Sequence, residues 1–402
     1  MYNYFMKILI TGGHLTPALS LIDALEKRFK KDLEIIFVGR KYALEQEKTQ
    51  SLEYKEITKR RIKFIPLQTG RLTRILTIRT IRSLFRVPFG FWHGWQIVKN
   101  ERPDLIFSFG GYLALPIVFW GFIFRIPIYT HEQTIHPGLS NRLIGILAKK
   151  VFIAFDEAKQ YFSKNKTIVT GNPIRKSVLT YLRRPRLRQE GFGLRPDEVW
   201  PTADEVGGQA HKIGCIKKDR PVIYITGGSL GSHSINEHIK KIIAKLLNYY
   251  VVIHQVGDTK EYKDYEYLIE LKKKLPNELQ NRYYVQKHFF EEEIGDIYSL
   301  ADLVIGRAGA NTFFELIALK KPAIFIPLPW AANCEQQKHA EMFKKFGVGE
   351  IFHQSDSSNH LLNLIGKMIE RLDKYKKNFN SLKYLYKKNA AELIVKEIIK
   401  KN

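Results

Sequence analysis

Two glycine-rich segments of the chain each follow a short apolar run and precede a segment with helical periodicity. They are Thr11-Gly12-Gly13-His14 and Gly227-Gly228-Ser229-Leu230-Gly231-Ser232. Glycine lets the backbone come close to a ligand, and the N–H groups at the start of a helix favour an anion. Both segments therefore predict contact with a ligand, and the second suits a pyrophosphate. For the first segment, a purely structural turn is an equal alternative.

A third segment, Arg307 to Glu315, also opens a helical pattern after an apolar run. Its Ala308-Gly309-Ala310 run is small enough for a ligand to approach the backbone closely. Glu315 follows one turn inside the helix, where its carboxylate can accept hydrogen bonds from two neighbouring ribose hydroxyls. Together these residues predict a nucleotide or sugar ligand. The alternative is that Glu315 only complements the helix dipole.

The spacing of the glycines argues against two common nucleotide-binding motifs. Neither of the first two segments reads G-x-G-x-x-G, and the second apolar run ends in Val38-Gly39-Arg40 without the carboxylate that binds the ribose of NAD. Arg40 leaves an NADP-dependent reductase as a minor alternative. The sequence contains no G-x-x-x-x-G-K-[ST] run of the P-loop type, so ATP hydrolysis is not expected.

The apolar runs predict the elements that hold these segments. Each is followed by a turn and a helical pattern, which is typical of a parallel sheet wrapped by helices. The runs of the first half are Lys7–Ile10, Glu34–Val38, Leu105–Phe109, Ile126–Tyr129 and Val151–Phe155. Those of the second half are Val222–Ile225, Val251–Gln255, Tyr283–Val285, Leu303–Ile305 and Ala323–Ile326. We expect an α/β protein of two doubly wound domains.

The bulk properties agree with two domains and indicate an anionic partner. A chain of 402 residues is longer than one core usually organises. Lys and Arg number 65 against 40 acidic residues, a formal charge of +25 that fits nucleic acid, a phosphate-rich substrate or acidic lipid. Cys215 and Cys334 support neither a disulfide framework nor a cysteine metal site. Since the N-terminus also lacks a signal-peptide pattern, we expect the reducing cytoplasm.

The segment Lys59–Trp95 interleaves many Lys and Arg residues with Ile, Leu, Phe and Trp. This composition suits a segment that lies on an anionic membrane surface. Binding of a phosphate backbone is the other use of such a run. No zinc-finger spacing, RNP-like phrase or stacked aromatic set accompanies it, so nucleic acid is not expected as a partner. A merely solvated basic face is the remaining alternative.

Three further segments stand out from the repeating pattern. Tyr112–Tyr129 is apolar enough to raise the question of a transmembrane helix, but Pro116 and Arg125 interrupt it, which favours a buried helix followed by a buried strand. Leu182–Asp219 is rich in Arg, Gly and Pro and is expected to be a surface insertion. From Lys367 onward, apolar residues at helical spacing among lysines predict amphipathic helices.

The order of local phrases resembles that of the MurG family of cell-wall glycosyltransferases. Each phrase alone is a weak match, but eight in the family's order, spaced as expected except around Leu182–Asp219, extend the resemblance over almost the whole chain. The phrases are Thr11 to His14 with Pro17-Ala18-Leu19, Phe109 to Tyr112, His131-Glu132-Gln133, Pro137 to Asn141, Gly171 to Arg175, Gly227-Gly228-Ser229, Arg307 to Glu315, and Pro327 to Gln337.

The resemblance implies a GT-B fold, in which two Rossmann-like domains face a cleft, with no catalytic metal and no cofactor. Residues 1–172 would form the N-terminal domain, which binds the acceptor and the membrane. Residues 173–385 would form the C-terminal domain for the UDP-sugar, with the insertion at about 182–219, and residues 386–402 a basic helix. The protein would act as a peripheral enzyme at the cytoplasmic face of the cell membrane.

The resemblance also implies site residues. Those for the donor UDP-sugar would be Thr11, Gly12, Gly13, Thr134, Arg175, Gly228, Ser229, Gly231, Ala310, Asn311, Thr312, Glu315, Gln336 and Gln337. Among them, Ser229 would hold the diphosphate and Arg175 would neutralise it. The acceptor would meet Gly110, Gly111 and Tyr112, whereas Asn141 is expected to be structural. N–H dipoles and an Arg stabilise the charge of departing UDP without a divalent ion.

The implied reaction moves N-acetylglucosamine from UDP-N-acetylglucosamine, with inversion, to an undecaprenyl-diphosphate-linked acceptor called lipid I, which gives lipid II. The acceptor hydroxyl needs a general base. His14 at the glycine turn is the first candidate, because imidazole titrates near neutral pH, and His131 is the second. For either residue the alternative is a buried, hydrogen-bonded histidine.

The chain departs from the family pattern at three places. The first loop lacks the glycine pair that usually precedes it, Thr134 stands where Asn is common, and Leu230 replaces a common Gln. These departures affect acceptor geometry more than donor binding. Two other functions stay open: a glycolipid synthase with UDP-glucose or UDP-galactose and diacylglycerol, which Glu335, Gln336 and Gln337 would help to distinguish, and a non-catalytic protein that binds nucleotide or lipid.

Overall fold

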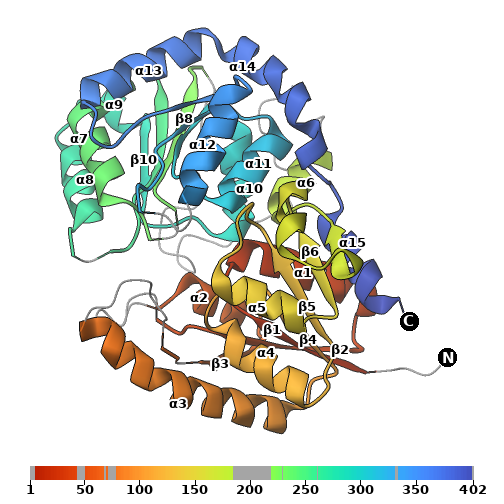
Figure 1. Cartoon of the computed structure of the whole chain (residues 1–402). Coiled ribbons are helices and arrows are strands. Elements are labelled where there is room, and N and C mark those ends of the chain that lie inside the picture. The colour runs from red at the N-terminus through yellow and green to blue at the C-terminus, as the bar shows by residue number, and fades with distance from the viewer. Residues whose placement is uncertain are drawn as a thin grey trace. The chain divides into compact units, whose positions relative to one another are not determined.

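The structure is a computed structural model of the whole chain. It describes residues 5–42, 50–67, 69–70, 78–183, 219–228, 230–259, 261–330 and 334–400. The chain divides into two compact units (Figure 1). Unit 1 comprises Met1–Arg175 and Tyr384–Asn402, and unit 2 comprises Lys176–Lys383. The chain therefore leaves unit 1 once and returns to it at the C-terminus.

Unit 1 is built on a seven-stranded parallel sheet with the order β3-β2-β1-β4-β5-β6-β7. Its strands are β1 (Met6–Thr11), β2 (Leu33–Gly39), β3 (Lys63–Pro66), β4 (Leu105–Ser108), β5 (Ile128–Glu132), β6 (Lys150–Ile153) and β7 (Thr167–Val169). In β1, Ile8 pairs with Ile35 of β2 on one side and with Leu105 of β4 on the other. The inner strands are almost wholly buried, as a parallel sheet covered on both faces requires.

Helices cover both faces of this sheet. They are α1 (Leu15–Phe29), α2 (Leu52–Lys59), α3 (Ile78–Glu101), α4 (Ala114–Ile123), α5 (Leu139–Leu147) and α15 (Ala390–Ile399), with short 3-10 helices at Asp156–Tyr161 and Lys164–Lys166. Successive residues of β1 face opposite sides. Ile8 lies in a core with α1 and α15, whereas Leu9 lies in a second core with α3, α4 and α5.

The C-terminal helix α15 is an integral part of unit 1. It packs against α1, and Ile394 and Ile398 lie in the same core as Ile8. Lys150 and Glu397 form an ion pair of 2.8 Å between β6 and α15. A helix thus lies within the residues 386–402 that were predicted to form a basic helix, and its apolar side covers part of one face of the sheet. The helix α15 itself carries Glu392, Lys396 and Glu397 and is not basic.

Unit 2 has a six-stranded parallel sheet with the order β10-β9-β8-β11-β12-β13. Its strands are β8 (Val222–Thr226), β9 (Val251–Gln255), β10 (Tyr283–Gln286), β11 (Leu303–Gly306), β12 (Ala323–Phe325) and β13 (Gly349–Ile351). Its helices are α6 (Lys176–Arg183), α7 (His233–Leu247), α8 (Asp264–Lys273), α9 (Asn277–Gln280), α10 (Glu291–Leu300), α11 (Ala310–Leu319), α12 (Glu335–Lys345), α13 (Ser358–Glu370) and α14 (Leu372–Asn378), before a 3-10 helix at Phe379–Leu385. The two doubly wound parallel sheets confirm the predicted α/β fold class.

All ten predicted strands are present, with ends that differ by up to three residues. The sequence analysis missed β3, β7 and β13, and each of these is an edge strand. An edge strand is half-exposed and short, so it carries no continuous apolar run to reveal it. The residues of β7, for example, are all only partly buried.

Two of the segments that stand out in the sequence can be compared with the structure. Lys59–Trp95, which was predicted to lie on a membrane surface, contains edge strand β3 and the first part of α3. In Tyr112–Tyr129, a helix and a strand do follow one another, but the prediction that the helix is buried is wrong. One side of α4 packs on the sheet, while Phe122 and Ile123 are 51% and 50% exposed. Residues 184–218 of the predicted insertion lie outside the described residues.

We expect Ile394→Ala to destabilise unit 1 by about 2–5 kcal/mol, since it opens a cavity in a fully buried site between α15 and α1. Hydrogen exchange should become faster in β1 and α1 and stay unchanged in β8 of unit 2. Ile146→Ala is the matched control, because Ile146 is 68% exposed. Equal effects of the two substitutions would show that α15 does not support the core.

Candidate functional site

Each sheet has one point where the connections from two adjacent strands diverge, and there the loops at the carboxyl ends come together. In unit 1 this point lies between β1 and β4, and in unit 2 between β8 and β11. A Cβ on Gly13 would lie 2.6 Å from the carbonyl oxygen of Gly110, so the two loops of unit 1 touch through their backbones. Ligands of doubly wound sheets bind at such points.

The first glycine loop is tied down by a carboxylate from α2. Gly13 N–H donates to Glu53 Oε1 at 3.2 Å, and Arg40 N–H donates to Glu53 Oε2 at 3.3 Å. Burial raises the pKa of Glu53, while these bonds and the Arg40 charge oppose the shift. The sequence analysis missed Glu53, because it lies 40 residues from the loop and no glycine or motif marks it.

His14 directly follows this loop and is the N-cap residue of α1. Its backbone is extended (φ −138°, ψ 105°), and its side chain makes no capping hydrogen bond. The imidazole is half-buried, and desolvation lowers its pKa to about 4. It is therefore neutral at pH 7, which is the form that can accept a proton.

His131 lies near the end of β5 and is only 2% exposed. Its Nε2 is 3.1 Å from the carbonyl oxygen of Gly171, which can only accept, so Nε2 carries the hydrogen and Nδ1 carries a lone pair. Burial lowers the pKa of His131 to about 4, the Gly171 bond opposes the shift, and the charge of nearby His14 adds to it. Both candidate bases thus lie at the same end of unit 1, but only His14 is partly accessible.

A buried hydrogen-bond network fixes the second glycine loop of unit 1. Gly111 N–H donates to Asn141 Oδ1 at 2.8 Å, and Asn141 Nδ2 donates to Glu132 Oε2 at 2.6 Å. Thr134 donates to Glu132 Oε1 through both its N–H and its hydroxyl, at 2.8 Å each. Gly110 has φ +79°, and a Cβ there would clash with Asn141. Half-buried Tyr112 follows this fixed turn and packs against the core.

The glycine loop of unit 2 crosses the segment after β9 at very close range. A Cβ on Gly231, which has φ +78°, would lie 2.0 Å from the carbonyl oxygen of Val256. Gln255 Nε2 donates to the Gly228 carbonyl at 2.9 Å, and Gly228 N–H donates to Thr226 Oγ1 at 3.1 Å. Ser229, which was predicted to hold the diphosphate, lies outside the described residues.

Arg307 joins this loop to the end of β11. Its Nη2 donates to Ser232 Oγ at 2.7 Å and to Ser234 Oγ at 2.9 Å, and its Nη1 donates to the Ile326 carbonyl at 2.9 Å. Burial lowers the pKa of Arg307 to about 10, so the guanidinium is still charged at neutral pH. In the sequence, Arg307 belongs to one of the phrases that resemble the family, and no role was predicted for it, although its position directly after a buried strand is a usable signal.

The other residues that were predicted to bind the donor sugar nucleotide lie in α11, in α12 and directly before α6. α11 begins at Ala310 with no side-chain cap from Gly309, and Glu315 in this helix is fully buried. Gln336 Oε1 accepts from Leu328 N–H at 3.0 Å, and Gln337 Nε2 donates to Glu341 Oε1 at 2.9 Å. Asn311, Thr312 and Arg175 are half-buried.

The structure therefore gathers most of the predicted residues into two groups. Thr11, Gly12, Gly13, His14, His131, Thr134 and Gly110 to Tyr112 lie in unit 1 around the carboxyl ends of β1, β4 and β5. Gly228, Gly231, Ala310 to Thr312 and Glu315 lie in unit 2 around the carboxyl ends of β8 and β11. Gln336 and Gln337 lie in unit 2 at the start of α12.

Comparisons with known proteins identify the family. The Glycosyltransferase family 28 N-terminal domain matches residues 10–153, and the Glycosyltransferase family 28 C-terminal domain matches residues 222–398. The chain belongs to glycosyltransferase family 28. A relative from Clostridium perfringens, a UDP-N-acetylglucosamine–N-acetylmuramyl-(pentapeptide) pyrophosphoryl-undecaprenol N-acetylglucosamine transferase, is 33% identical over 403 residues and 98% of each chain. A Bacillus cereus transferase of the same description, numbered 2, is 30% identical over 98% of this chain and 99% of its own.

Solved structures show the same fold. The crystal structure of Acinetobacter baumannii MurG matches 98% of this glycosyltransferase and 100% of its own chain, with 21% identity and a TM-score of 0.63. The glycosyltransferase of kitacinnamycin matches 97% and 98% of the two chains, with 14% identity and a TM-score of 0.58. The full-length identity of about 30% confirms the resemblance to the MurG family, and the two parallel sheets with these neighbours confirm the GT-B fold.

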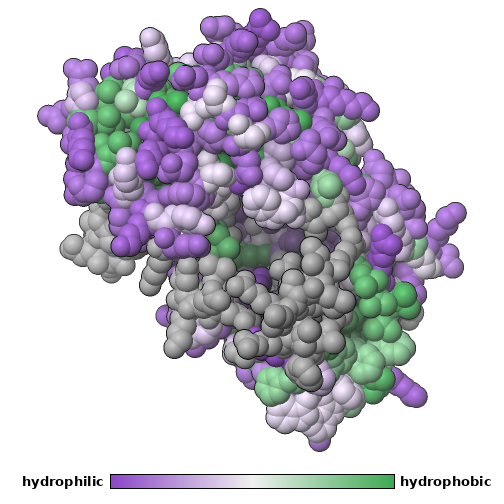
Figure 2. Space-filling view, turned by 60° about the vertical axis from the view of Figure 1, so that its left-hand side comes forward, coloured by the Kyte–Doolittle hydropathy of each residue, from purple (hydrophilic) through white to green (hydrophobic). Residues whose placement is uncertain are grey.

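Unit 1 of this glycosyltransferase also carries an exposed apolar surface on α4 and α5, the apolar patch. Its most exposed large side chains are Phe119, Phe122, Ile123, Phe124, Leu139, Leu143 and Ile146. A pocket of about 530 Å³ beside the patch is lined by Phe122 and Leu147 and by three basic residues, Arg125, Lys149 and Lys166. Figure 2 shows a continuous apolar area at the lower right of the view. Within the described residues, no helix is long and apolar enough to span a membrane.

The pH dependence of stability tests the buried state of His131. Because its folded pKa of about 4 lies below the ordinary 6.5, the unfolded chain binds the proton more tightly between these values. The stability of unit 1 should be complete above about pH 6.5 and fall as the pH drops toward 4. His131→Gln keeps the donor to Gly171 but does not titrate, so between pH 7 and pH 5 it should lose about 2 kcal/mol less than the wild type.

The difference in the free energy of unfolding between wild type and His131→Gln is measured by denaturant unfolding, with hydrogen exchange of β5 as the readout. His360→Gln is the control, because His360 is an exposed histidine of unit 2, and it should leave the unit 1 curve unchanged. If wild type and His131→Gln lose stability equally over this range, His131 does not have the lowered pKa.

Proposed function

We propose that this glycosyltransferase transfers N-acetylglucosamine from UDP-N-acetylglucosamine to the lipid-linked acceptor lipid I, and so forms lipid II for peptidoglycan synthesis. The observation that carries the proposal is the neutral, partly accessible imidazole of His14 at the first glycine loop. It supplies the base that a sugar hydroxyl needs, in a chain whose full-length relatives bear the name of this transferase. This reaction uses no cofactor and no metal ion.

In the proposed mechanism, His14 accepts the proton of the acceptor hydroxyl as its oxygen attacks the anomeric carbon of the donor sugar. The attack comes from the face opposite UDP, the bond from the anomeric carbon to the phosphate oxygen breaks, and the configuration inverts. His131 keeps a positioning role, because its Nε2 is engaged by Gly171 and its ring is almost fully buried. This ranks His14 above His131 as the base.

The second glycine loop of unit 1 is proposed to face the acceptor diphosphate. This turn, Gly110 to Tyr112, is held in one conformation because Gly111 N–H donates to Asn141, which in turn donates to Glu132. At the first loop, the Glu53 carboxylate already occupies the Gly13 N–H. A diphosphate at that N–H would have to displace Glu53, so Gly12 and Gly13 shape the site next to His14 more than they bind phosphate.

In unit 2, three kinds of group are proposed to stabilise the negative charge that develops on the departing UDP. These are the glycine loop with Gly228, Ser229 and Gly231, the first turn of α11 with Ala310, Asn311 and Thr312, and the cation Arg307. Arg175, the cation that the resemblance predicts for the diphosphate, is the last residue of unit 1. First-turn N–H groups of a helix lack intrahelical partners and carry partial positive charge. Such preorganised donors stabilise a developing diphosphate charge without a divalent ion.

The ribose and the sugar of the donor are proposed to be bound by residues of α11 and α12. Glu315 would accept the ribose hydroxyls, which requires the ligand to reach its buried carboxylate. Gln336 and Gln337 at the start of α12 would bind the sugar hydroxyls. Thr11 and Thr134 complete the predicted donor set, although the Thr134 hydroxyl is bonded to Glu132.

We also propose that unit 1 attaches the enzyme peripherally to the cytoplasmic face of the membrane. The apolar patch would enter the headgroup region, and Arg125, Lys149 and Lys166 beside it would meet anionic lipid phosphates. The predicted basic segment Lys59–Trp95 adds Phe89 and Trp92, each 51% exposed, on α3, which packs against α4.

The reaction is tested by radiolabel transfer from UDP-N-acetylglucosamine to a lipid I analogue in detergent. His14→Ala should lower kcat about 10²- to 10⁴-fold because the base is lost. Glu315→Gln should instead raise the KM for the donor about tenfold, because one acceptor oxygen is lost. His353→Ala, which changes an exposed histidine of unit 2, is the control and should keep full activity.

Two outcomes of this assay would contradict the proposal. Full activity of His14→Ala would remove His14 as the base. Absence of transfer by the wild type, with intact binding of UDP, would exclude lipid I as the acceptor and favour diacylglycerol or a binding-only protein.

Membrane attachment is tested by sedimentation with phosphatidylglycerol vesicles. Phe122→Ser with Ile123→Ser should weaken binding about tenfold or more, since each exposed side chain would bury apolar area in the membrane. The control is Tyr249→Ser, a change of a 67% exposed aromatic residue in unit 2. Equal binding by wild type and double variant would show that another surface meets the lipid.

A further inference from the structure

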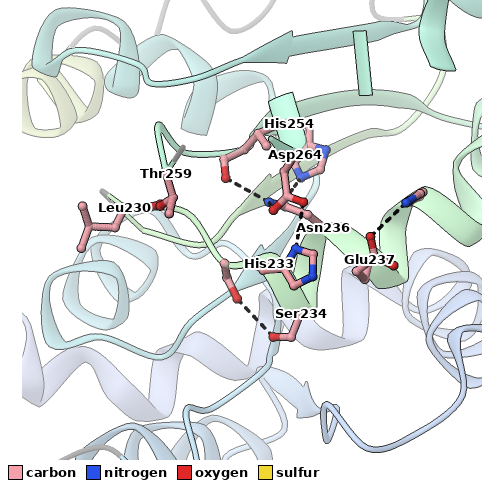
Figure 3. Close-up of polar contacts among 11 residues, drawn as sticks. Leu230, His233, Ser234, Asn236, Glu237, His254, Thr259 and Asp264 are labelled. Atoms are coloured by element: carbon pink, nitrogen blue, oxygen red, sulfur yellow. Dashed lines mark hydrogen bonds and ion pairs between the residues drawn. The ribbon is translucent and has the colours of Figure 1, made fainter. Parts of the chain in front are cut away.

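Unit 2 contains a cluster of metal-ligand side chains that the transfer reaction does not use. His233, Glu237 and Asp264 each offer one ligand atom, and these atoms lie within 4.8 Å of one another. Figure 3 shows the three side chains together, with His233 and Glu237 on one helix and Asp264 opposite them. All three are partly exposed, so an ion in solution can reach them.

The elements around the cluster explain how the three residues meet. His233 begins α7, and Glu237 follows one turn later at i+4, which places both on the same face of the helix. Asp264 begins α8, after Lys263 in the left-handed conformation (φ 50°) redirects the chain. Asp264 Oδ1 then lies 2.8 Å from His233 Nδ1.

A second layer of hydrogen bonds orients Asp264 from the core. Its Oδ2 accepts from Asn236 Nδ2 at 2.7 Å, and Asn236 is only 2% exposed. Asn236 Oδ1 lies 3.1 Å from His254 Nε2, and His254 Nδ1 lies 2.9 Å from the Tyr283 hydroxyl. A buried chain of three side chains, Tyr283, His254 and Asn236, thus ends on this carboxylate. Metal ligands are held by outer partners of this kind.

The other two ligands are held less rigidly. The His233 ring stacks on Tyr262, with centroids 3.9 Å apart and an angle of 13° between the planes. Glu237 Oε1 lies 3.1 Å from Lys240 Nζ, and Lys240 Nζ lies 3.5 Å from the centre of the Tyr267 ring. One carboxylate oxygen of Glu237 therefore meets Lys240, and a carboxylate has a second oxygen for another partner.

We propose that His233, Glu237 and Asp264 bind a divalent transition-metal ion, with Zn²⁺ as the first choice. An imidazole nitrogen with two carboxylates suits Zn²⁺, whereas Mg²⁺ and Ca²⁺ prefer oxygen ligands alone. Bonds of roughly 2.1 Å place the ligand atoms of a tetrahedral site about 3.4 Å apart. The His233–Asp264 contact would open slightly, Glu237 would move inward, and water would take the fourth position.

The ion would link two segments that lie beside the glycine loop of unit 2. One is the start of α7, which follows the glycine loop, and the other comprises residues 256–259 and 261–264. Thr259 Oγ1 already donates to the Leu230 carbonyl at 2.9 Å, and Gly231 packs against Val256. The ion would therefore be structural. It would hold the glycine loop in place from outside, while the transfer chemistry stays independent of metal.

The proposal is tested by titrating the full chain, free of tags and stripped of metal, with Zn²⁺ in a calorimeter and with Co²⁺ by visible absorption. One ion should bind per chain. Glu237→Gln should lower the affinity at least tenfold, and His233→Ala should abolish binding and the Co²⁺ bands. His360→Ala is the matched control, because His360 also pairs with an aspartate, Asp356, at 3.3 Å, and should bind like the wild type.

Several results would overturn the proposal. These are the absence of Zn²⁺ and Co²⁺ binding by the wild type, unchanged affinity of His233→Ala, and binding of Mg²⁺ as tight as that of Zn²⁺. Circular dichroism and thermal midpoints without metal identify any variant that fails to fold. If His233→Ala fails to fold, the Zn²⁺ affinity of Glu237→Gln, a change of a partly exposed side chain, decides whether the site binds metal. Hydrogen exchange of Leu230 and Gly231 should slow when Zn²⁺ binds, and unchanged exchange would refute the proposed fastening of the loop.

Discussion

The close contact of backbones at the two switch points is the constraint on which the rest of the molecule depends. At Gly13 and at Gly231 a Cβ would lie 2.6 Å and 2.0 Å from a carbonyl oxygen of the neighbouring loop. Only glycine fits there, because both the space and the positive φ at Gly231 exclude a side chain. With the loops in contact, His14 and the Gly110–Gly111 turn share one small region of unit 1. In the same way, Arg307 can reach Ser232 in unit 2.

Buried polar groups stabilise these loops because each is given several partners. Glu132 is 2% exposed, and burial raises the pKa of its carboxyl. Its oxygens accept from Thr134 and Asn141, whose bonds oppose that shift. Since an unpaired buried carboxylate would cost several kcal/mol, the three residues act as one unit. The same network leads to Gly111, so the stability of the core and the geometry of the second loop have one origin.

The sequence predicted what depends on local pattern. Buried strands appear as apolar runs, and the glycine loops that follow β1, β4 and β8 appear as short motifs, so the fold and the outline of the site were accessible. Three other features depend on packing between residues that are far apart in the sequence, and the sequence did not reveal them. Glu53 reaches Gly13 from another helix, the half-exposed edge strand β3 has no apolar run, and α4 looked wholly buried although its outer side is exposed. An apolar helix on a sheet and an apolar helix with an exposed side have the same composition, so only packing separates them.

A histidine with a pKa of about 4 is a weak base, and this raises the question of how His14 can accept a proton near neutral pH. The shift comes from desolvation, which penalises the imidazolium when no opposite charge is near. The proposed diphosphate would change that balance, because one negative charge at a distance of about 6 Å would stabilise the imidazolium by roughly 3 kcal/mol at an effective dielectric of 20. That interaction would raise the pKa of His14 back toward the ordinary value of an imidazole. The imidazole would then gain basicity only when an anionic ligand is present, and in the free protein it would stay neutral. The burial that weakens the base in the free protein is thus what makes its strength depend on the ligand.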